Sequence, residues 1–264
     1  MAKRTPVVVN GQELSAGVFL IDKPMGMSSF AVVKKVRWLL GIKKVGHAGT
    51  LDPFATGLLI VCAGRPATRH IDRFMAGRKT YQALLQLGVE TETQDPEGAV
   101  TANRPVPELT GQELSSVLQE FTGPQMQAPP PYSAAKHKGK PLYHYARQGI
   151  MIQKDPKPIE IYSLESDGYD PGTAQLAITV SCSRGTYIRV LAADIGNTLG
   201  CGAHLVQLRR IHSGGFSVVD AIPGEQLFAG DDCLSTLLGG MNTVEQALEQ
   251  LRCSGFANYE TQPK

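Results

Sequence analysis

The chain has 264 residues, of which 42% are hydrophobic, and no stretch of about eighteen residues is apolar throughout. This composition is typical of an ordinary globular protein with a sizeable core and argues against a membrane protein. The first residues, MAKRTPVVVNGQEL, lack the apolar segment of a secretory signal. We therefore expect the protein in the cytoplasm, with no membrane partner.

The formal net charge of +2 is unevenly distributed. From Asp220 onward there are seven acidic and two basic residues, so residues 1–219 carry a net charge of +7. A basic body suits a polyanion such as a nucleic acid, because each neutralised phosphate releases bound counterions. Solubility alone also accounts for a charge of this size.

The five cysteines are scattered and never spaced as C-x-x-C, which fits neither a disulfide framework nor a zinc site. We expect reduced, mostly buried thiols with no chemical role, and no metal site. The five are Cys62, Cys182, Cys201, Cys233 and Cys253.

The N-terminal part predicts a strand, a turn and a helix. Residues 17–22 (GVFLID) form a short apolar run that ends in the turn Lys23-Pro24-Met25-Gly26. Ser28 or Ser29 caps the following amphipathic helix, and Gly41 ends it. Three of its basic residues, Lys34, Lys35 and Arg37, lie on its outer face.

Between that helix and an apolar strand at 58–62 lies GIKKVGHAGTLDPFATG, which is too rich in Gly, Pro and Thr for a regular element. Loops of this kind, held between a helix and a core strand, often carry binding and catalytic groups.

The remaining elements intermix without the βαβα order of a parallel sheet. We therefore predict an α+β fold around a mixed, largely antiparallel sheet flanked by helices. The expected elements are a helix at 66–76, a strand at 79–87, a polar turn at 91–98, a helix at 113–121, an extended segment at 127–131, a partly helical stretch at 132–149, strands at 159–163 and 174–182, a helix within 184–199, and a helix at 242–251.

Three segments stand out by residue chemistry: the loop with His47 and Asp52, the strand with Tyr81, and residues 184–189. An aspartate, an aromatic ring and an arginine make one site if the fold brings them together. A structural alternative for Asp52 is a turn residue, since Asp-Pro pairs initiate turns.

Six segments, in order, resemble the tRNA pseudouridine-55 synthase family (TruB type) over most of residues 17–218. They are GVFLIDKPMGMSS from Gly17, VGHAGTLDPFATGLL from Val45, RKTYQALLQLG from Arg78, PPPYSAAKHKGKPLYHYARQGI from Pro129, CSRGTYIRVLAADIG from Cys182 and GAHLVQLRR from Gly202.

The resemblance implies roles for individual residues. Asp52 matches the family's catalytic aspartate, and Arg189 matches the arginine that pairs with it. Tyr81 matches the tyrosine that stacks on the target base, and His47 the histidine that enters the RNA loop where that base leaves. Further residues match the uracil pocket, Tyr187 and Leu208, or a pair that supports the active-site loop, Lys23 and Pro24.

The implied reaction breaks the N1–C1′ bond of a uridine and joins C5 of the uracil to the same sugar carbon, so no cofactor is needed. The carboxylate adds to the base, attacks C1′ or removes a sugar proton; the resemblance leaves these three routes open. An ionised buried carboxylate needs a nearby cation, which is the role implied for Arg189. The target base must also leave its stack, and Tyr81 then replaces the lost stacking.

The resemblance also implies a partner, the T-arm of tRNA, whose phosphates basic side chains would position. We expect a monomer with no protein partner. The candidate phosphate contacts are Lys43, Lys44, Lys136, Lys138 and Arg147.

Many members of the family carry a C-terminal PUA domain, and the forty-six residues from 219 to 264 are too few for one. We expect a compact member in three parts: an N-terminal extension at 1–16, the catalytic domain at 17–218, and a short acidic C-terminal helix and tail at 219–264.

Three alternative functions would need other residues or patterns. A non-catalytic RNA-binding module would not need Asp52. A metal-dependent hydrolase using His47, Asp52, His70 and His204 lacks any recognised ligand spacing. A phosphate-binding NTPase loop at GHAGTLDP lacks the G-x-x-x-x-G-K-[ST] pattern.

Overall fold

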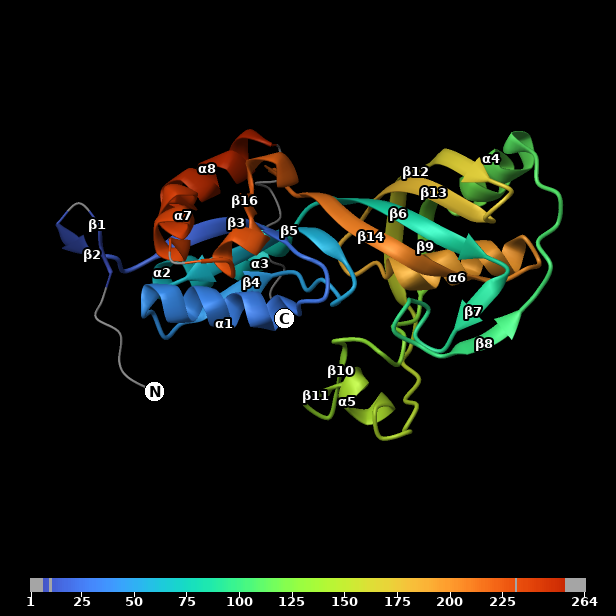
Figure 1. Ribbon diagram of the computed structural model, residues 1–264, viewed down its shortest axis with the longest axis horizontal. Coiled ribbons are helices and arrows are strands. Elements are labelled where there is room, and N and C mark those ends of the chain that lie inside the picture. The colour runs from blue at the N-terminus through green and yellow to red at the C-terminus, as the bar shows by residue number, and fades with distance from the viewer. Residues whose placement is uncertain (1–6, 10, 231, 255–264) are drawn as a thin grey trace. The chain divides into compact units, whose positions relative to one another are not determined.

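The computed structural model describes residues 7–9, 11–230 and 232–254. Spatial contacts divide the chain into two compact units (Figure 1). Unit 1 comprises Met1–Lys79 and Arg209–Lys264, and unit 2 comprises Thr80–Leu208. Helices and a large, mostly antiparallel sheet make up the fold, which confirms the predicted α+β class.

Unit 1 contains the strands β1 (Val8–Val9), β2 (Gln12–Glu13), β3 (Gly17–Lys23), β4 (Val45–Ala48), β5 (Thr56–Ala63), β15 (Phe216–Ser217), β16 (Ile222–Pro223) and β17 (Met241–Asn242). Its helices are α1 (Ser29–Leu40), α2 (Arg65–Thr68), α3 (Ile71–Met75), η1 (Val218–Asp220), η2 (Gly224–Leu227), α7 (Cys233–Gly239) and α8 (Val244–Cys253).

Unit 2 contains β7 (Val89–Thr91), β8 (Val100–Asn103), α4 (Gly111–Glu120), β9 (Gly123–Gln127), β10 (Lys136–His137), β11 (Lys140–Pro141), α5 (Leu142–Ala146), β12 (Lys157–Asp170), β13 (Gln175–Cys182) and α6 (Ile188–Thr198). Two long strands cross a unit boundary in the chain, β6 (Lys79–Leu87) and β14 (Ala203–Ser213).

The sheet of unit 1 is built on β5. Antiparallel β3 pairs with it from Gly17 opposite Ala63 to Lys23 opposite Gly57. On the other side, β4 pairs with the end of β5, and β14 runs parallel to its start, with Arg210 opposite Gly57. The loop between β4 and β5 therefore lies next to β14.

Both faces of the β3–β5 pair are buried. Phe19 and Ile21 pack in a core with residues of α1 and α7, whereas Val18 and Leu20 pack in a second core with residues of α3 and α8. Strands covered on both faces are apolar throughout rather than alternating. This explains the continuous apolar runs of β3 and β5.

Gly57 is needed where β14 approaches β5. Its φ is +100°, and a Cβ atom at this position would collide with the backbone of Arg210. A side chain here would be strained and would force β14 away. The glycine therefore fixes the start of β5 against the strand that carries Arg210.

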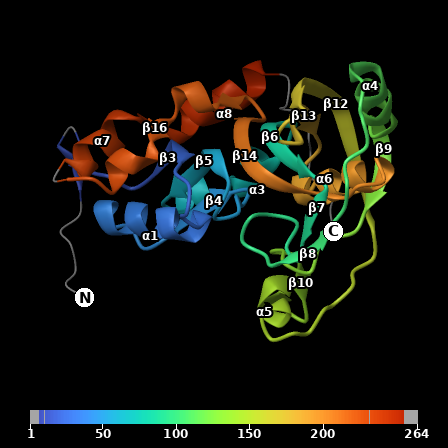
Figure 2. The same ribbon diagram turned by 45° about the vertical axis from the view of Figure 1, so that its right-hand side comes forward.

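Unit 2 has the strand order β14-β6-β13-β12-β9, and β12 pairs antiparallel with both β13 and β9. Alternate residues of β6 and β13 are buried, as expected for a sheet with one covered face. Helices α4 and α6 lie beside these strands, and β10, β11 and α5 form a small lobe reached by two stretches without regular structure (Figure 2).

Most of the expected elements are confirmed. Ser28 caps α1 by accepting a hydrogen bond from the backbone N–H of Ala31, and Gly41 ends the helix in the left-handed conformation. The strand at 79–87 has the predicted bounds. Of the five cysteines, all free, only Cys253 is exposed, so the expectation of mostly buried thiols is confirmed.

Three expectations were wrong in detail. The loop at 41–57 contains a strand, β4, because its residues pair with β5 despite their glycines. The helix expected at 66–76 is two short helices, α2 and α3. The segment after 218 contains α7 and two short strands that pair with β3, besides the expected final helix, α8.

Residues 1–6 and 10 of the expected extension, and residues 231 and 255–264 of the expected C-terminal segment, lie outside the described residues. Within the described ranges, no helix is long and apolar enough to cross a membrane.

We predict that Ile60→Ala lowers the free energy of unfolding by about 2–5 kcal/mol, because Ile60 is fully buried in β5 and its truncation leaves a cavity. Urea unfolding measures the change. Ile150→Ala is the matched control: this isoleucine is 50% exposed, and its truncation should have little effect. Equal losses in both variants would contradict this description of the core.

Candidate active site

Asp52 lies in the loop between β4 and β5 in unit 1 and is partly buried. Its backbone carbonyl accepts a hydrogen bond from the N–H of Ala55 at 3.2 Å, which closes a tight turn. The turn interpretation of Asp52 is therefore correct as local structure. Contacts of the neighbouring residues show that this turn is also held from several sides.

Ser29, the first residue of α1, holds the residue before Asp52. Its buried hydroxyl donates to the carbonyl oxygen of Leu51 and accepts from the N–H of the same residue, both at 2.9 Å. One side chain thus satisfies both backbone groups of Leu51. Because these groups are buried, leaving them unpaired would cost free energy.

Lys23, the last residue of β3, holds the residue after Asp52. Its fully buried ammonium group donates to the carbonyl oxygens of Pro24, Met27 and Pro53 at 2.9, 2.7 and 3.2 Å. The N–H of Gly26 donates to the Pro53 carbonyl as well, at 2.9 Å. Lys23 and Pro24 therefore belong to a turn that is tied directly to the Asp52 loop.

Arg210 holds the start of the same loop from β14. Only 1% of the residue is exposed, and its guanidinium donates to the carbonyl oxygens of Gly49 at 3.0 Å, Thr50 at 3.5 Å and Leu58 at 2.8 Å. The preceding Arg209 forms a two-pronged ion pair with Asp22, at 2.9 and 2.7 Å. Arg209 thus ties β14 to β3, and Arg210 ties β14 to β5 and to the Asp52 loop.

His47 lies on β4, just before this loop. Burial lowers the pKa of its imidazole below 6.5, the positive charge of Arg210 lowers it further, and the backbone of Gly49 acts in the opposite direction. The ring is therefore uncharged at neutral pH.

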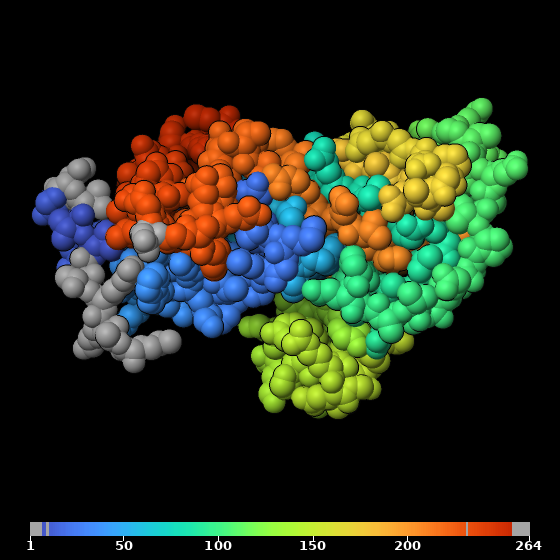
Figure 3. Space-filling view, viewed as in Figure 1, coloured from blue at the N-terminus to red at the C-terminus, as the bar shows by residue number. Residues whose placement is uncertain are grey.

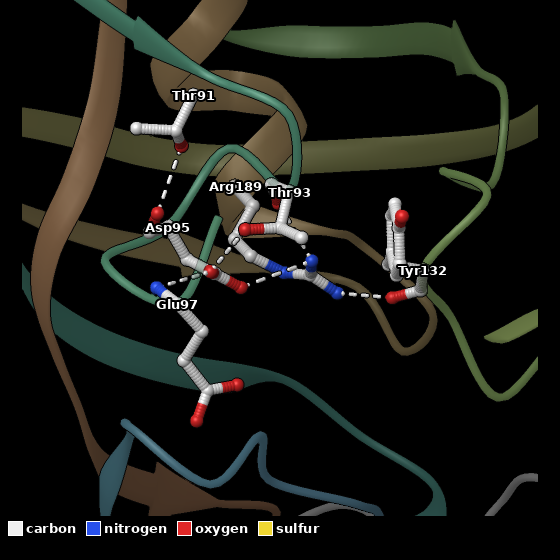
Figure 4. A network of polar contacts seen from close by, with 6 residues as sticks. All are labelled: Thr91, Thr93, Asp95, Glu97, Tyr132 and Arg189. Atoms are coloured by element: carbon white, nitrogen blue, oxygen red, sulfur yellow. Dashed lines mark hydrogen bonds and ion pairs between the residues drawn. The ribbon is translucent and has the colours of Figure 1, made fainter. Parts of the chain in front are cut away.

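Arg189, near the start of α6, lies in a polar network within unit 2 (Figure 4). Its buried guanidinium donates to the carbonyl oxygens of Thr93 at 2.8 Å and Tyr132 at 2.7 Å, and it forms an ion pair with Asp95 at 3.2 Å. Asp95 in turn accepts from the Thr93 hydroxyl and from the N–H of Glu97. Three segments distant in sequence are thereby joined.

The polar turn expected at 91–98 is therefore part of this network. Asp95 is buried and is the ionic partner of Arg189 within unit 2. The implied pairing of Arg189 with Asp52 concerns residues of different units and stays a prediction.

Two of the three candidate base-contacting residues of unit 2 are buried. Tyr81 on β6 and Leu208 on β14 are buried, and Tyr187, just before α6, is partly buried. The amide side chain of Gln127 accepts from the N–H of Tyr187 at 2.7 Å and donates to its carbonyl oxygen at 3.1 Å. Gln127 therefore fixes the backbone where α6 begins.

The candidate phosphate contacts lie on exposed segments. Lys43 and Lys44 follow α1 in unit 1, whereas the other three are in the lobe of unit 2 around β10, β11 and α5. There Arg147 lies over the ring of Tyr143, 5.5 Å from its centroid. These exposed residues are Lys43, Lys44, Lys136, Lys138 and Arg147.

The metal-hydrolase alternative needs several ligand side chains that lie together. No group of three or more His, Cys, Asp or Glu side chains that could hold a metal ion occurs among the residues whose structure is described. His204, one of its candidates, instead makes a 2.8 Å hydrogen bond from Nδ1 to the carbonyl of Val89.

Four positioning residues escaped the sequence analysis: Ser29, Asp95, Gln127 and Arg210. Two signals were present. Asp95 precedes a proline, as Asp52 does, and Arg210 is the second arginine of the matched segment GAHLVQLRR. Nothing in the local sequence distinguishes Ser29 from Ser28, or Gln127 from other glutamines.

Two family models match the chain. The TruB family pseudouridylate synthase (N terminal domain) matches residues 37–188, and the tRNA pseudouridylate synthase B C-terminal domain matches residues 189–247. Together they cover the Asp52 loop, the Arg189 network and most of the C-terminal segment.

Similar proteins agree with these matches. A tRNA pseudouridine synthase B of Desulfotalea psychrophila is 56% identical over 223 residues, which cover 83% of this chain and 91% of that protein. One of Bordetella parapertussis is 45% identical over 250 residues, 94% of this chain and 98% of that protein. A chain in a solved Cbf5-Nop10-Gar1 complex superposes with a TM-score of 0.65 at 27% identity, covering 89% of this chain and 62% of that one. The chain therefore belongs to the TruB family of pseudouridylate synthases.

Proposed function

We propose that this chain converts uridine to pseudouridine at position 55, in the T-loop of tRNA, with Asp52 as its catalytic carboxylate. The observation that carries the proposal is the Asp52 loop of this TruB-family chain, held at Leu51 by Ser29 and at Pro53 by Lys23. A carboxylate fixed by its neighbours meets a flipped nucleoside in one geometry. An ordinary surface turn needs no such support.

The reaction accounts for the residue types. The N1–C1′ bond breaks, the uracil turns, and a new bond joins C5 to C1′; the C5 proton leaves to solvent while N1 gains one. The reaction has no net redox change, so we propose that no cofactor takes part. Asp52 acts on the nucleoside in its ionised form, because a protonated carboxyl is neither a nucleophile nor a base.

The other candidate residues receive supporting roles in this proposal. Arg189 keeps Asp52 ionised, and Tyr81 stacks on the flipped uracil in place of its former neighbours. His47 enters the vacated space in the RNA loop, while Tyr187 and Leu208 line the uracil pocket. Lys23 and Pro24 support the Asp52 loop, in keeping with their hydrogen bonds and position.

Substrate binding is assigned to the T-arm of tRNA, through the basic residues after α1 and in the α5 lobe. Both segments are exposed and rich in lysine. We also propose a cytoplasmic monomer without a protein partner. Within it, residues 17–218 form the catalytic domain, 1–16 an extension and 219–264 a C-terminal segment.

Asp52→Asn is expected to lower kcat by on the order of 10³-fold or more while leaving tRNA affinity nearly unchanged, because it removes the charge but keeps the shape. Tritium release from transcripts labelled at uridine C5 measures turnover, and filter binding measures affinity. A transcript with the T-loop uridine replaced should release none of the label expected from that position.

The matched control is Asp72→Asn, an exposed aspartate of the same unit, which should retain wild-type turnover. If the wild-type chain binds tRNA and releases no tritium, the non-catalytic RNA-binding module becomes the better account. Full activity of Asp52→Asn would contradict the assigned carboxylate.

The adjacent serines of α1 offer a second test. Ser29→Ala removes both hydrogen bonds to Leu51 and should lower kcat about tenfold, since the Asp52 loop loses a fixed point. Ser28→Ala removes only the helix cap and should cost about 1 kcal/mol of stability without changing kcat. Steady-state kinetics and urea unfolding of both variants separate the two effects; equal kcat values would contradict the role given to Ser29.

The lowered pKa of His47 predicts a pH effect on stability. Below pH 6.5 the unfolded chain takes up a proton on this residue before the folded chain does, so stability is lost as pH falls from 6.5 toward the folded pKa. Above pH 6.5 both states carry a neutral ring and the effect vanishes. Urea unfolding of the wild type and His47→Gln should diverge only on the acid side; parallel curves would contradict the pKa direction.

A further inference from the structure

The outer side of α1 carries two exposed aromatic rings. Its inner side packs in the core through residues such as Val32 and Val36, whereas Phe30, Lys34 and Trp38 are exposed. Each of these residues is four positions from the next, so together they form one stripe along the helix. Phe30 is 59% exposed and Trp38 56%, on the side of an amphipathic helix that is ordinarily polar.

Lysines lie against both rings. The Nζ atom of Lys34 is 6.0 Å from the centroid of the Phe30 ring, and that of Lys35 is 5.1 Å from the Trp38 centroid. We call Phe30, Lys34, Lys35 and Trp38 the α1 outer face; α1 lies at the surface in Figure 3. The sequence of α1, SFAVVKKVRWLL, contains no acidic residue. The face is therefore both aromatic and positively charged.

This combination fits unpaired nucleotides. Bases stack on aromatic rings, and lysines neutralise the phosphates between them. Phe30 and Trp38 are two helical turns apart, about 12 Å, which is the length of three to four stacked nucleotides at ~3.4 Å each. Lys34 lies between the two rings in sequence, where the phosphates of such a strand would pass.

A second copy of this chain fits the face less well. In a two-fold symmetric contact the same patch lies on both sides, so the interface would gather two copies each of Lys34 and Lys35 with no acidic residue of α1 to pair with them. Like charges brought together at an interface oppose association. Charge complementarity therefore favours a polyanion.

We propose that the α1 outer face binds unpaired nucleotides of the RNA substrate, at a surface separate from the residues that hold the Asp52 loop. The proposal rests on the proposed function, since that function supplies RNA as the ligand. The bases stack on Phe30 and Trp38, and Lys34 and Lys35 contact the phosphates.

Trp38 makes a direct test possible, because it is the only tryptophan in the chain. Its fluorescence reports on this face and on no other site. A tRNA transcript and a short oligouridylate should both quench the emission, since a stacked base quenches an indole. A blunt RNA duplex of the same length offers no unpaired base and should quench far less.

Kinetic variants give the second readout. Trp38→Ala and Phe30→Ala should each raise the KM for tRNA about tenfold while leaving kcat unchanged. Trp38→Phe keeps a ring and should retain most of the affinity. The matched control is Val219→Ala, which truncates an apolar side chain that is 84% exposed and outside α1, and should change neither constant.

Unchanged emission on saturation with tRNA, together with an unchanged KM in both alanine variants, would overturn the proposal. So would emission that depends on protein concentration without RNA, if Trp38→Ala abolishes a dimer seen by sedimentation; the occupant would then be a second copy. The failure of the proposed function looks different: the wild type would form no pseudouridine, yet tRNA would still quench Trp38.

Discussion

The site depends on one constraint: the backbone of the Asp52 loop has to be held in place by residues from other segments. The Asp52 loop lacks the ladder of a regular element, so side chains from elsewhere bond its backbone. Ser29 fixes Leu51, Lys23 fixes Pro53, and Arg210 fixes the carbonyls of Gly49 and Thr50. Burying two cations for this purpose is costly, and bonds to carbonyl oxygens offset only part of the cost. A free-energy cost of this kind is typical of functional sites, where the backbone must be held in one conformation, rather than of stable scaffolds.

A buried cation also holds irregular backbone in unit 2. Arg189 is buried and bonds the carbonyls of Thr93 and Tyr132 besides pairing with Asp95, so one guanidinium organises two segments that have little regular structure. Arginine suits this role because its planar group presents several donors in fixed directions. In both units, then, a regular element supplies a buried cation, a strand in unit 1 and helix α6 in unit 2, and the cation holds the irregular backbone beside it.

Sequence reasoning succeeded where information was local. The apolar run of β3, the alternating pattern of β6 and the capped periodicity of α1 each determine their own element. It failed at β4, because that strand exists only through its pairing with β5. The same holds for the candidate site. Residue type and the six matched segments single out Asp52 and Arg189, whereas the positioning residues were missed. The hydrogen bonds of Ser29 and Arg210 span 22 and about 160 residues, and no local pattern encodes them.

Helix α1 takes part in both proposals, because one side of it contacts the Asp52 loop and the other carries the α1 outer face. Successive residues of a helix point about 100° apart, so Ser29 faces inward to Leu51 while Phe30, its neighbour, faces solvent. The inner side is constrained by the core and by the Asp52 loop, and any shift of the helix would strain the two Ser29 bonds. On the outer side, Phe30 and Trp38 are more than half exposed, so the core does not bury them. More than half of each ring faces solvent, which leaves area on which a base can stack in the proposed contact.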